Sequence, residues 1–319
     1  MQAETKKIVV LGTGGTIAGL AQGAAEGRYR AAQKPVGDLL AGVAVPAGAA
    51  LQLEQVAQID SKDMDLPVWQ ALLKACQVHL ARADVSGLVI THGTDTLEET
   101  AWLLQALLAP RKPVVLTCAM RPADAPDADG PRNLADALAV ATDPGACGVL
   151  AVCAGRILGA QDVQKFHGSR LDAFGSGEAG DLGRVQAGQV HWLREPVATA
   201  PVPVLQAVLA AAALPRVEIV LSHAAASGAM LDALTDPDTA ARHGVAPVRG
   251  LVLAGTGGGT LHREIELAAR RARAAGVRIV RTSRCADGWP QPRTDDEFPV
   301  LALSAVKARL ALMLDLLGS

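Results

Sequence analysis

The sequence predicts an α/β protein, with a larger N-terminal domain built on a mostly parallel sheet flanked by helices and a smaller α/β C-terminal domain. Three observations lead to this fold class. Short apolar runs recur along the 319 residues, helical patterns separate them, and a proline-rich stretch divides the chain. A chain of this length also exceeds one ordinary hydrophobic core, so two domains are expected.

The apolar runs indicate strands that are buried on both faces. Each run is short and rich in Val, Ile and Leu, and most are bounded by Gly, Pro or Asp. The runs occupy residues 8–11, 88–91, 114–117, 149–153, 217–221, 251–254 and 277–280. Strands of this kind are typical of parallel sheets that are covered by helices on both sides.

Three intervening segments carry apolar residues at helical spacing. These residues are Leu97, Ala101, Leu104 and Leu108; Leu134, Leu138 and Ala141; and Leu261, Ile265, Ala268 and Ala272. Thr96 and Glu99 form a capping-box pattern before the first helix, and Asn133 is predicted to cap the second. In sheets built by such alternation, ligands bind beyond the carboxyl ends of the strands.

A linker is predicted between the two domains. Three prolines fall within residues 196–203, which excludes a central strand or a helix interior there. We therefore expect an N-terminal domain over residues 1–195, a linker over 196–214 that includes a short Ala-rich helix, and a C-terminal domain over 215–319.

Composition excludes several classes of function. The net charge is −2 and no basic block is present, so no nucleic-acid partner is expected. The apolar runs are too short to cross a membrane, and no signal-peptide pattern precedes the first strand, so we expect a cytoplasmic protein. The five cysteines lack CxxC spacing, which supports neither a disulfide framework nor a metal site.

Two glycine-rich turns follow predicted strands, and each presents a threonine. Thr16 lies in the turn after residues 8–11, and Thr94 lies in the turn after residues 88–91. Because both turns follow strand ends, we predict that the two threonines face each other across one site. A dinucleotide cradle is disfavoured, since G-x-G-x-x-G spacing fails when counted from Gly12 or from Gly255.

A threonine hydroxyl needs a base before it can act as a nucleophile. Tyr29 lies in a predicted lid over residues 18–33, Asp95 adjoins Thr94, and Lys165 follows an apolar run. The threonines and Lys165 have ordinary alternatives: a threonine after a turn can simply cap a helix, and a single lysine is usually a solvated surface charge. With backbone N–H groups of the turns as an oxyanion hole, the set suits amide hydrolysis.

His92 is interpreted as structural. It stands at a strand end beside Gly93, and no Ser/His/Asp pattern completes it as a catalytic base.

Together these motifs resemble those of the bacterial-type L-asparaginases, and the resemblance covers nearly the whole chain. The two threonine motifs carry most of it: Thr13-Gly14-Gly15-Thr16-Ile17-Ala18 and Thr91-His92-Gly93-Thr94-Asp95-Thr96-Leu97-Glu98-Glu99-Thr100. It continues through Asp60-Ser61-Lys62-Asp63-Met64, Ala119-Met120-Arg121-Pro122, Asp129-Gly130-Pro131-Arg132-Asn133-Leu134 and Asp162-Val163-Gln164-Lys165, and more loosely through Arg281-Thr282-Ser283-Arg284.

The resemblance implies an activity and a role for each matched residue. The implied reaction is hydrolysis of L-asparagine to aspartate and ammonia, with weaker glutamine hydrolysis and without metal or organic cofactor. Thr16 would be the nucleophile with Tyr29 as its partner, and Thr94, Asp95 and Lys165 would form a second triad. The implied substrate-binding residues are Gly15, Ser61, Lys62, Thr94, Asp95, Ala119 and Asp295.

The resemblance also implies a homotetramer, a dimer of dimers with its sites at the subunit interface. Asp295 is our choice, among Asp295, Asp296 and Glu297, for a carboxylate supplied by the partner subunit.

Two residues depart from the family pattern. Lys62 stands where many members carry Gln or Glu, and Gly258 aligns with an Asn of many periplasmic members. Both changes touch the pocket for the substrate's α-amino group, so a non-catalytic amino-acid-binding or sensing protein is the alternative hypothesis.

Overall fold

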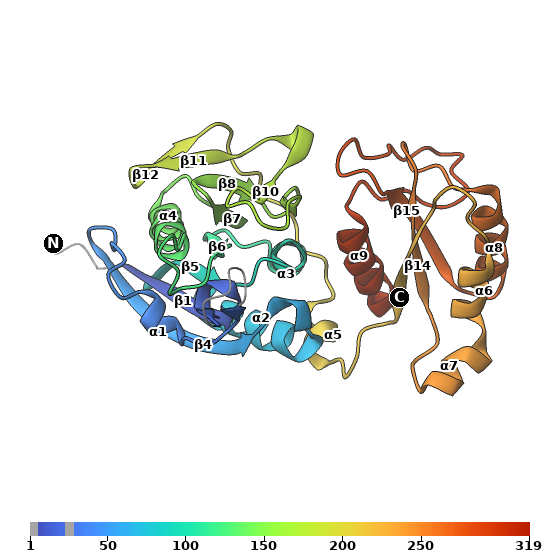
Figure 1. The fold of residues 1–319 in the computed structure, drawn as a ribbon, viewed down its shortest axis with the longest axis horizontal. Helices are drawn as coiled ribbons and strands as arrows, with labels where there is room; N and C mark the ends of the chain where they lie inside the picture. Colours follow the sequence, from blue (N-terminus) through green and yellow to red (C-terminus); the bar gives the residue numbers. More distant parts are fainter. Residues whose placement is uncertain (1–5, 23–28) are drawn as a thin grey trace. The chain divides into compact units, whose positions relative to one another are not determined.

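The computed structural model describes residues 6–22 and 29–319, which form two compact units, Met1–Val202 and Pro203–Ser319 (Figure 1). Each unit has its own sheet with helices on both faces, so the predicted α/β fold class is confirmed. The units meet between residues 202 and 203, inside the segment expected as a linker. The expected helix in that segment is α5, Leu205–Ala210.

The N-terminal unit is built on an eight-stranded sheet in the order β12-β11-β8-β7-β6-β5-β1-β4. The five strands from β7 to β4 are parallel, and the other three pair antiparallel. The strands are β1 (Lys6–Gly14), β4 (Ala49–Ile59), β5 (Val85–Thr91), β6 (Val114–Thr117), β7 (Val149–Cys153), β8 (Arg156–Gly159), β11 (Gly183–Gln186) and β12 (Gln189–Trp192).

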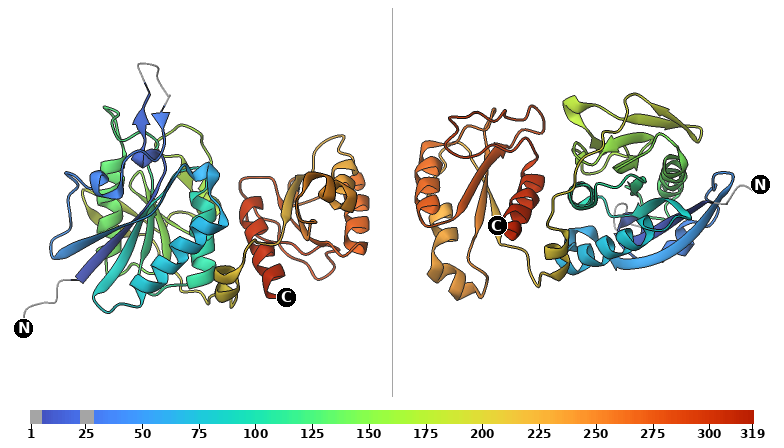
Figure 2. Two further views of the ribbon diagram at one scale, coloured as in Figure 1. Left: turned by 90° about the horizontal axis from the view of Figure 1, so that it is seen from below. Right: turned by 180° about the vertical axis from the view of Figure 1, so that it is seen from behind.

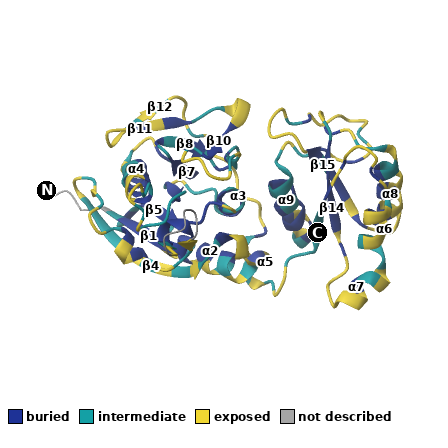
Figure 3. Ribbon diagram, viewed as in Figure 1, coloured by how far each residue is buried: buried dark blue, intermediate teal, exposed yellow. Residues whose placement is uncertain are grey.

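Helices cover both faces of this sheet (Figure 1). On one face, α1 (Val36–Leu39) and α4 (Gly130–Thr142) share a core with alternate strand residues, such as Ile8 and Val10. Two further helices, α2 (Leu66–Leu80) and α3 (Leu97–Leu108), also pack on the sheet. Figure 3 shows the central strands as the most buried part of the unit. Their all-apolar sequences follow from this two-sided burial.

Two short ribbons lie outside the main sheet. Strands β2 (Leu20–Ala21) and β3 (Tyr29–Arg30) pair beyond the carboxyl end of β1, where they project from the unit in Figure 2. Strands β9 (Gln164–Lys165) and β10 (Phe174–Gly175) form the second ribbon. Three 3₁₀ turns complete the unit: η1 (Thr16–Ala18), η2 (Ser61–Asp63) and η3 (Gly177–Ala179). Of the predicted lid over 18–33, residues 23–28 lie outside the described residues.

The C-terminal unit has a parallel sheet in the order β13-β14-β15, from Val217–Leu221, Gly250–Gly255 and Arg278–Ser283. Helix α9 (Ala305–Gly318) packs on one face. Helices α6 (Ala229–Thr235) and α8 (Arg263–Ala274) share a core with the other face, and α7 (Pro237–His243) follows α6. Figure 1 shows α9 and α8 on opposite sides of β14 and β15.

Thr96 directly precedes α3 as predicted, but neither Thr96 nor Asn133 caps a helix with its side chain. Helix α3 begins after Thr96, but the Thr96 hydroxyl makes no capping bond and donates to the carbonyl of Ser61 at 2.8 Å. Helix α4 begins earlier than expected, at Gly130, so Asn133 lies inside its first turn. The Asn133 amide instead bonds Cys118 and Ala154. In both cases a distant chain segment offers the side chain a better partner than its own helix end.

Candidate active site

The two threonine turns touch each other through their glycines. Strands β1 and β5 are paired up to Gly12 and Thr91, so their turns emerge side by side at the carboxyl edge. Gly15 has φ +82°, and a β-carbon there would stand 2.3 Å from Cα of Gly93. Only glycine allows this approach, because any side chain would overlap the facing backbone. The structure therefore brings Thr16 and Thr94 to one edge of one sheet.

Thr16 opens η1, directly after Gly15, and is 6% exposed. Its Oγ1 lies 2.8 Å from Oη of Tyr29, with either oxygen able to donate. Tyr29 belongs to β3, whose pairing with β2 returns the chain to the Thr16 turn. The structure thus joins these two predicted residues, and a phenol in this position can exchange a proton with the threonine hydroxyl.

Thr94 has a different partner, the amine of Lys165. Nζ of Lys165 donates to Oγ1 of Thr94 at 2.7 Å and to Oδ1 of Asp95 at 2.6 Å. The Lys165 side chain is 16% exposed, whereas that of Asp95 is 51% exposed. These three residues were predicted to act together, and the structure places them in mutual contact although Lys165 is 71 residues from Thr94 in sequence.

Ser61 lies beneath the second threonine turn. It is 2% exposed, and its Oγ accepts the backbone N–H of Asp95 at 3.2 Å. A β-carbon on Gly93 would meet this Oγ at 2.4 Å, so a second glycine is needed here for close packing. The predicted residues Ser61, Thr94 and Asp95 are thus contiguous.

Lys62 follows Ser61 and points its amine at a carboxylate. Nζ bonds Oδ2 of Asp63 at 2.5 Å, in a pair in which both side chains are largely exposed. The hydrogen bond that Lys62 donates to Asp63 raises the pKa of Lys62, and the nearby charges of Asp60 and Asp95 act in the same direction. A positive charge at this position is therefore surrounded by negative charge.

His92 is fully buried and lies at the end of β5, directly before the second turn. Its Nδ1 lies 2.8 Å from the carbonyl of Gly93, which can only accept. Burial lowers the pKa of His92 to about 4, so the ring is neutral at neutral pH. Among the described residues Nε2 has no hydrogen-bond partner. A neutral ring that fixes Gly93 is a structural group rather than a general base.

Ala119 comes directly after β6 and Cys118 and is 1% exposed. A β-carbon built on Gly130 would lie 3.6 Å from Ala119 and 3.0 Å from Ile17. Ala119 therefore shares a packing layer with the residue that follows Thr16.

The last predicted site residue, Asp295, belongs to the C-terminal unit. It lines a cavity of about 170 Å³ with Arg281 and Arg293. Of the three acidic candidates, Asp296 pairs with Arg281 and Glu297 pairs with Arg270. Asp295 forms no hydrogen bond or ion pair with any residue of 6–22 or 29–319. In the same unit, a β-carbon on Gly258 would meet nothing within 4 Å.

Two supporting residues were not found by sequence reasoning. Oε1 of Glu98 accepts the backbone N–H of Lys165 at 3.2 Å, and Asp129 accepts the N–H groups of Met120 and Arg121. Both acids occur in the quoted motifs, but nothing in their spacing indicates a partner 67 residues away in the case of Glu98. Similarly, the N–H of Gly15 is bound by the carbonyl of Ile59, so it is not available as an oxyanion donor.

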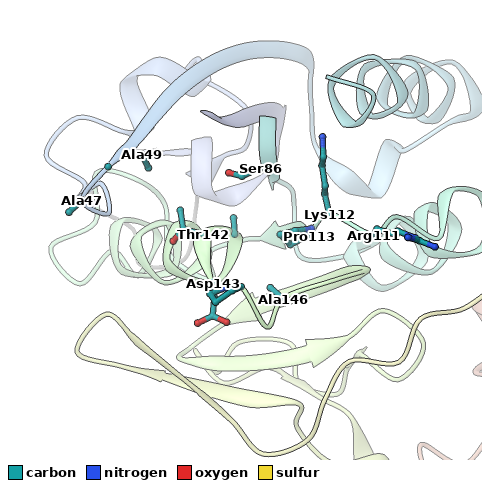
Figure 4. Close-up of a pocket in the computed structure, with 12 residues that line it drawn as sticks. Ala47, Ala49, Ser86, Arg111, Lys112, Pro113, Thr142, Asp143 and Ala146 are labelled. Carbon is teal, nitrogen blue, oxygen red and sulfur yellow. The ribbon is translucent and has the colours of Figure 1, made fainter. Parts of the chain in front are cut away.

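A separate cavity of about 460 Å³ lies at the opposite end of the same sheet (Figure 4). Its lining includes Ala49 at the start of β4, Pro113 directly before β6, and Thr142 at the end of α4. These residues mark the amino ends of the parallel strands, whereas ligands of such sheets bind at the carboxyl ends. The cavity is therefore distinct from the threonine site.

Comparisons with known proteins agree with this architecture. The N-terminal asparaginase domain family matches residues 7–198, and the glutaminase/asparaginase C-terminal domain family matches residues 216–317. A probable periplasmic L-asparaginase of Haemophilus influenzae is 35% identical, over 98% of this chain and 89% of its own length. A glutaminase-asparaginase of Pseudomonas aeruginosa is 37% identical, over 88% of this chain and 76% of its own.

A solved structure, that of a probable cytoplasmic L-asparaginase from Campylobacter jejuni, has the same fold. The TM-score is 0.86 at 34% identity, covering 98% of this chain and 96% of that one. Fold and site thus define a class of two-unit α/β proteins in which two glycine turns present threonines at one sheet edge. Within that class, the chain belongs to the asparaginase/glutaminase family.

Over residues 6–22 and 29–319, no helix has both the length and the apolar character needed to cross a membrane.

Proposed function

We propose that this protein hydrolyses the side-chain amide of L-asparagine to give L-aspartate and ammonia, with weaker activity on glutamine. One observation carries the proposal: two buried threonine hydroxyls at one sheet edge each have a separate proton-exchanging partner, Tyr29 for Thr16 and Lys165 for Thr94. Relatives named L-asparaginase and glutaminase-asparaginase support the choice of substrate.

In the proposed reaction, Oγ1 of Thr16 attacks the amide carbon, and its proton passes to the phenol oxygen of Tyr29 while the phenol proton moves on to the leaving nitrogen. The C–N bond then breaks, so ammonia departs and an acyl-enzyme on Thr16 remains. Water then attacks the ester, releases aspartate and restores the Thr16 hydroxyl. Because Gly15 N–H is already bonded, we propose that the N–H groups of Thr16 and Thr94 stabilise the oxyanion.

The second triad is proposed to move protons. In its amine form, Lys165 can accept the proton of Thr94 across their 2.7 Å contact. Asp95, 2.6 Å away, stabilises the ammonium that results. Thr94 can then take a proton from water during deacylation or assist the leaving nitrogen.

Substrate binding is proposed to use the groups around the second turn. Ser61 and Asp95 would bind the α-carboxylate and α-amino group, with Gly15, Thr94 and Ala119 lining the pocket. Since Asp63 pairs with Lys62, the cation at this position is compensated and compatible with a bound ammonium.

We propose further that the active form is a homotetramer, a dimer of dimers in which Asp295 of one subunit completes the site of its neighbour. The carboxylate of Asp295 has no partner among the described residues, whereas Asp296 and Glu297 are paired with arginines, and this difference supports the choice. Light scattering coupled to size exclusion tests the assembly. A monomer with full activity would overturn the proposal of shared sites.

A cytoplasmic location is proposed on the similarity to the Campylobacter jejuni protein, whereas the Haemophilus influenzae relative is a probable periplasmic one. Cell fractionation with periplasmic and cytoplasmic marker enzymes distinguishes the two compartments.

The activity is tested by measuring ammonia release from asparagine by the purified protein, with the Thr16→Ala variant assayed in parallel. We expect turnover by the parent and almost none by the variant. A parent that binds aspartate in calorimetry without releasing ammonia would favour a sensing protein on the same fold.

A further inference from the structure

Two cysteines lie side by side directly behind the candidate active site. Cys118 follows β6 and Cys153 ends β7, and the register that pairs Thr117 with Val152 brings Cys118 opposite Cys153. Their sulfur atoms are 3.0 Å apart, and the residues are 1% and 4% exposed. Both are thiols in the structure.

The backbone around this pair is held from both sides. The Asn133 amide donates to the carbonyl of Cys118 at 2.9 Å, and its oxygen accepts the N–H of Ala154 at 3.0 Å. The Thr117 hydroxyl donates to the carbonyl of Val152 at 2.8 Å. Two strand ends that are clamped in this way cannot drift apart, so the two sulfurs remain neighbours.

This geometry suits a covalent bond. Adjacent strands are spaced by about 4.8 Å, within the range of Cα separations found in disulfides. The sulfurs need to approach by about 1 Å to reach a bonded distance of roughly 2.05 Å. Small rotations of the two side chains would supply that movement.

We propose that Cys118 and Cys153 are an oxidative modification site at which a small peroxide forms an intrachain disulfide, and that this bond lowers the activity of the adjacent threonine site. A thiolate of the pair attacks one peroxide oxygen, which gives a sulfenic acid and hydroxide. The second sulfur attacks the sulfenic sulfur, the S–S bond forms, and the remaining oxygen leaves as water. In total two thiols and one hydrogen peroxide give one disulfide and two waters, with the peroxide reduced by two electrons.

The rate of this step is set by the environment of the pair. The hydrogen bond that the Cys118 thiol shares with Cys153, followed by burial, raises the pKa of Cys118, so little thiolate is present at neutral pH. The disulfide should therefore form slowly near neutrality and faster as the pH rises.

A short chain of contacts links the pair to the reacting groups. Ala119 follows Cys118 and shares a packing layer with Ile17, the neighbour of Thr16. The charge of Lys165 also acts on Cys118. A displacement of about 1 Å in such a site can lower turnover by up to two orders of magnitude, and we expect about tenfold. This second part of the inference rests on the proposed function, whereas formation of the disulfide does not.

The test treats the native full-length protein with hydrogen peroxide at about pH 8.5, where more thiolate is present. Unreacted thiols are then alkylated in denaturant, and the digest is read by mass spectrometry. We expect one crosslinked pair of peptides that contain Cys118 and Cys153, lighter by two hydrogens and separated by dithiothreitol. Recovery of both cysteines as alkylated thiols, or as sulfinic or sulfonic acids, would overturn the proposal.

Two variants separate the effect on activity from general oxidation. Cys153→Ala removes the pair without touching the candidate site, and Cys285→Ser removes an exposed thiol while keeping the pair. Under peroxide we expect asparagine turnover to fall about tenfold in the parent and in Cys285→Ser. It should recover with dithiothreitol and stay unchanged in Cys153→Ala.

An equal loss in Cys153→Ala, or a complete crosslink without loss in the parent, would overturn the link to activity. If the untreated parent does not hydrolyse asparagine, the proposed function fails, while the mass measurement still decides whether the disulfide forms.

Discussion

The two threonine turns are alike in sequence and in place, but they hold their partners in different ways. The partner of Thr16 is Tyr29, a 39% exposed residue on a two-residue strand that, over residues 6–22 and 29–319, pairs with β2 alone. The partner of Thr94 is Lys165, whose side chain is 16% exposed and whose N–H is bound by Glu98. One partner is carried by a projecting ribbon and the other is fixed to the body of the unit.

This difference indicates that Tyr29 and Lys165 have different roles. A fixed lysine keeps the second triad preorganised, whether or not substrate is bound. A tyrosine on a two-stranded ribbon that projects from the unit is typical of elements that close over a ligand. Substitutions of Thr94 or Lys165 should therefore alter the chemical steps alone. Substitutions of Tyr29 should alter substrate entry as well.

The largest effect is expected from removing the proposed nucleophile. Thr16→Ala should lower kcat for asparagine by about 10³-fold or more, because no acyl-enzyme can form. Thr16→Ser keeps the oxygen and should retain measurable turnover. Full activity in Thr16→Ala, measured by ammonia release, would show that the other turn supplies the nucleophile.

Lys165→Met should lower kcat by about 10² to 10⁴, since it removes the group that we propose exchanges a proton with Thr94. Lys165→Arg tests whether charge alone is enough, because a guanidinium keeps its proton at all working pH values. We expect a loss of this size in both variants, with unchanged melting temperature. Retained activity in the arginine variant would make Lys165 a fixed charge instead of a proton carrier.

His92, which lies directly before the second threonine turn, should make the stability of the protein depend on pH. Since the pKa of His92 is lowered from 6.5 to about 4 in the fold, the unfolded chain binds the extra proton between these values. His92 therefore contributes stability above about pH 6.5 that is lost as the pH falls towards 4.

Over this window the free energy of unfolding should fall by about 3 kcal/mol more in the parent than in His92→Gln. Urea titrations of both proteins at several pH values give the two slopes. Equal slopes would mean that the ring is protonated in the fold.

Tyr29→Phe should lower kcat by about 10- to 100-fold, which corresponds to one lost hydrogen bond to a group that becomes charged. The ring remains, so the ribbon should still close. Burst kinetics in the parent and in the variant would locate the loss in the acylation step. A loss as large as that of Thr16→Ala would mean that no other group, such as water, can take over the proton transfer from Thr16.

The smallest effect is expected at Lys62. Lys62→Gln should lower KM for asparagine by about threefold or less, because Asp63 already compensates the charge. Lys74→Gln removes another exposed lysine, on α2, and serves as the matched control with unchanged KM. A rise in KM on Lys62→Gln would show that the lysine attracts the substrate's carboxylate.

Much of the fold follows from local patterns in the sequence. All seven apolar runs are strands, because burial on both faces leaves a continuous apolar signature. Strand β4 was not predicted, because it is an edge strand in which Gln and Glu alternate with apolar residues. The failed caps at Thr96 and Asn133 show the limit of local reasoning, because partners 35 and 15 residues away compete for those side chains.

Only part of the site could be predicted from the residues themselves. The glycine-rich turns indicate Thr16 and Thr94 as site residues, but no spacing rule connects Lys165 to a threonine 71 residues earlier. The contact between Lys165 and Thr94 depends on where β9 meets the carboxyl edge of the sheet. It was therefore predicted only from the family resemblance. Whether Lys62 repels an ammonium likewise depends on a rotamer, which places its amine on Asp63.

The contact between Gly15 and Gly93 has a consequence for how this sequence can change. A β-carbon on Gly15 would overlap Cα of Gly93, and one on Gly93 would overlap Ser61. No second substitution relieves the first clash, because the obstructing atoms belong to the main chain. A library that randomises position 15 should therefore return glycine, whereas a side chain at position 93 would first require a smaller residue in place of Ser61. The turn that carries Thr94 thus limits which residues the Thr16 turn can carry, although 78 residues separate the two glycines in the chain.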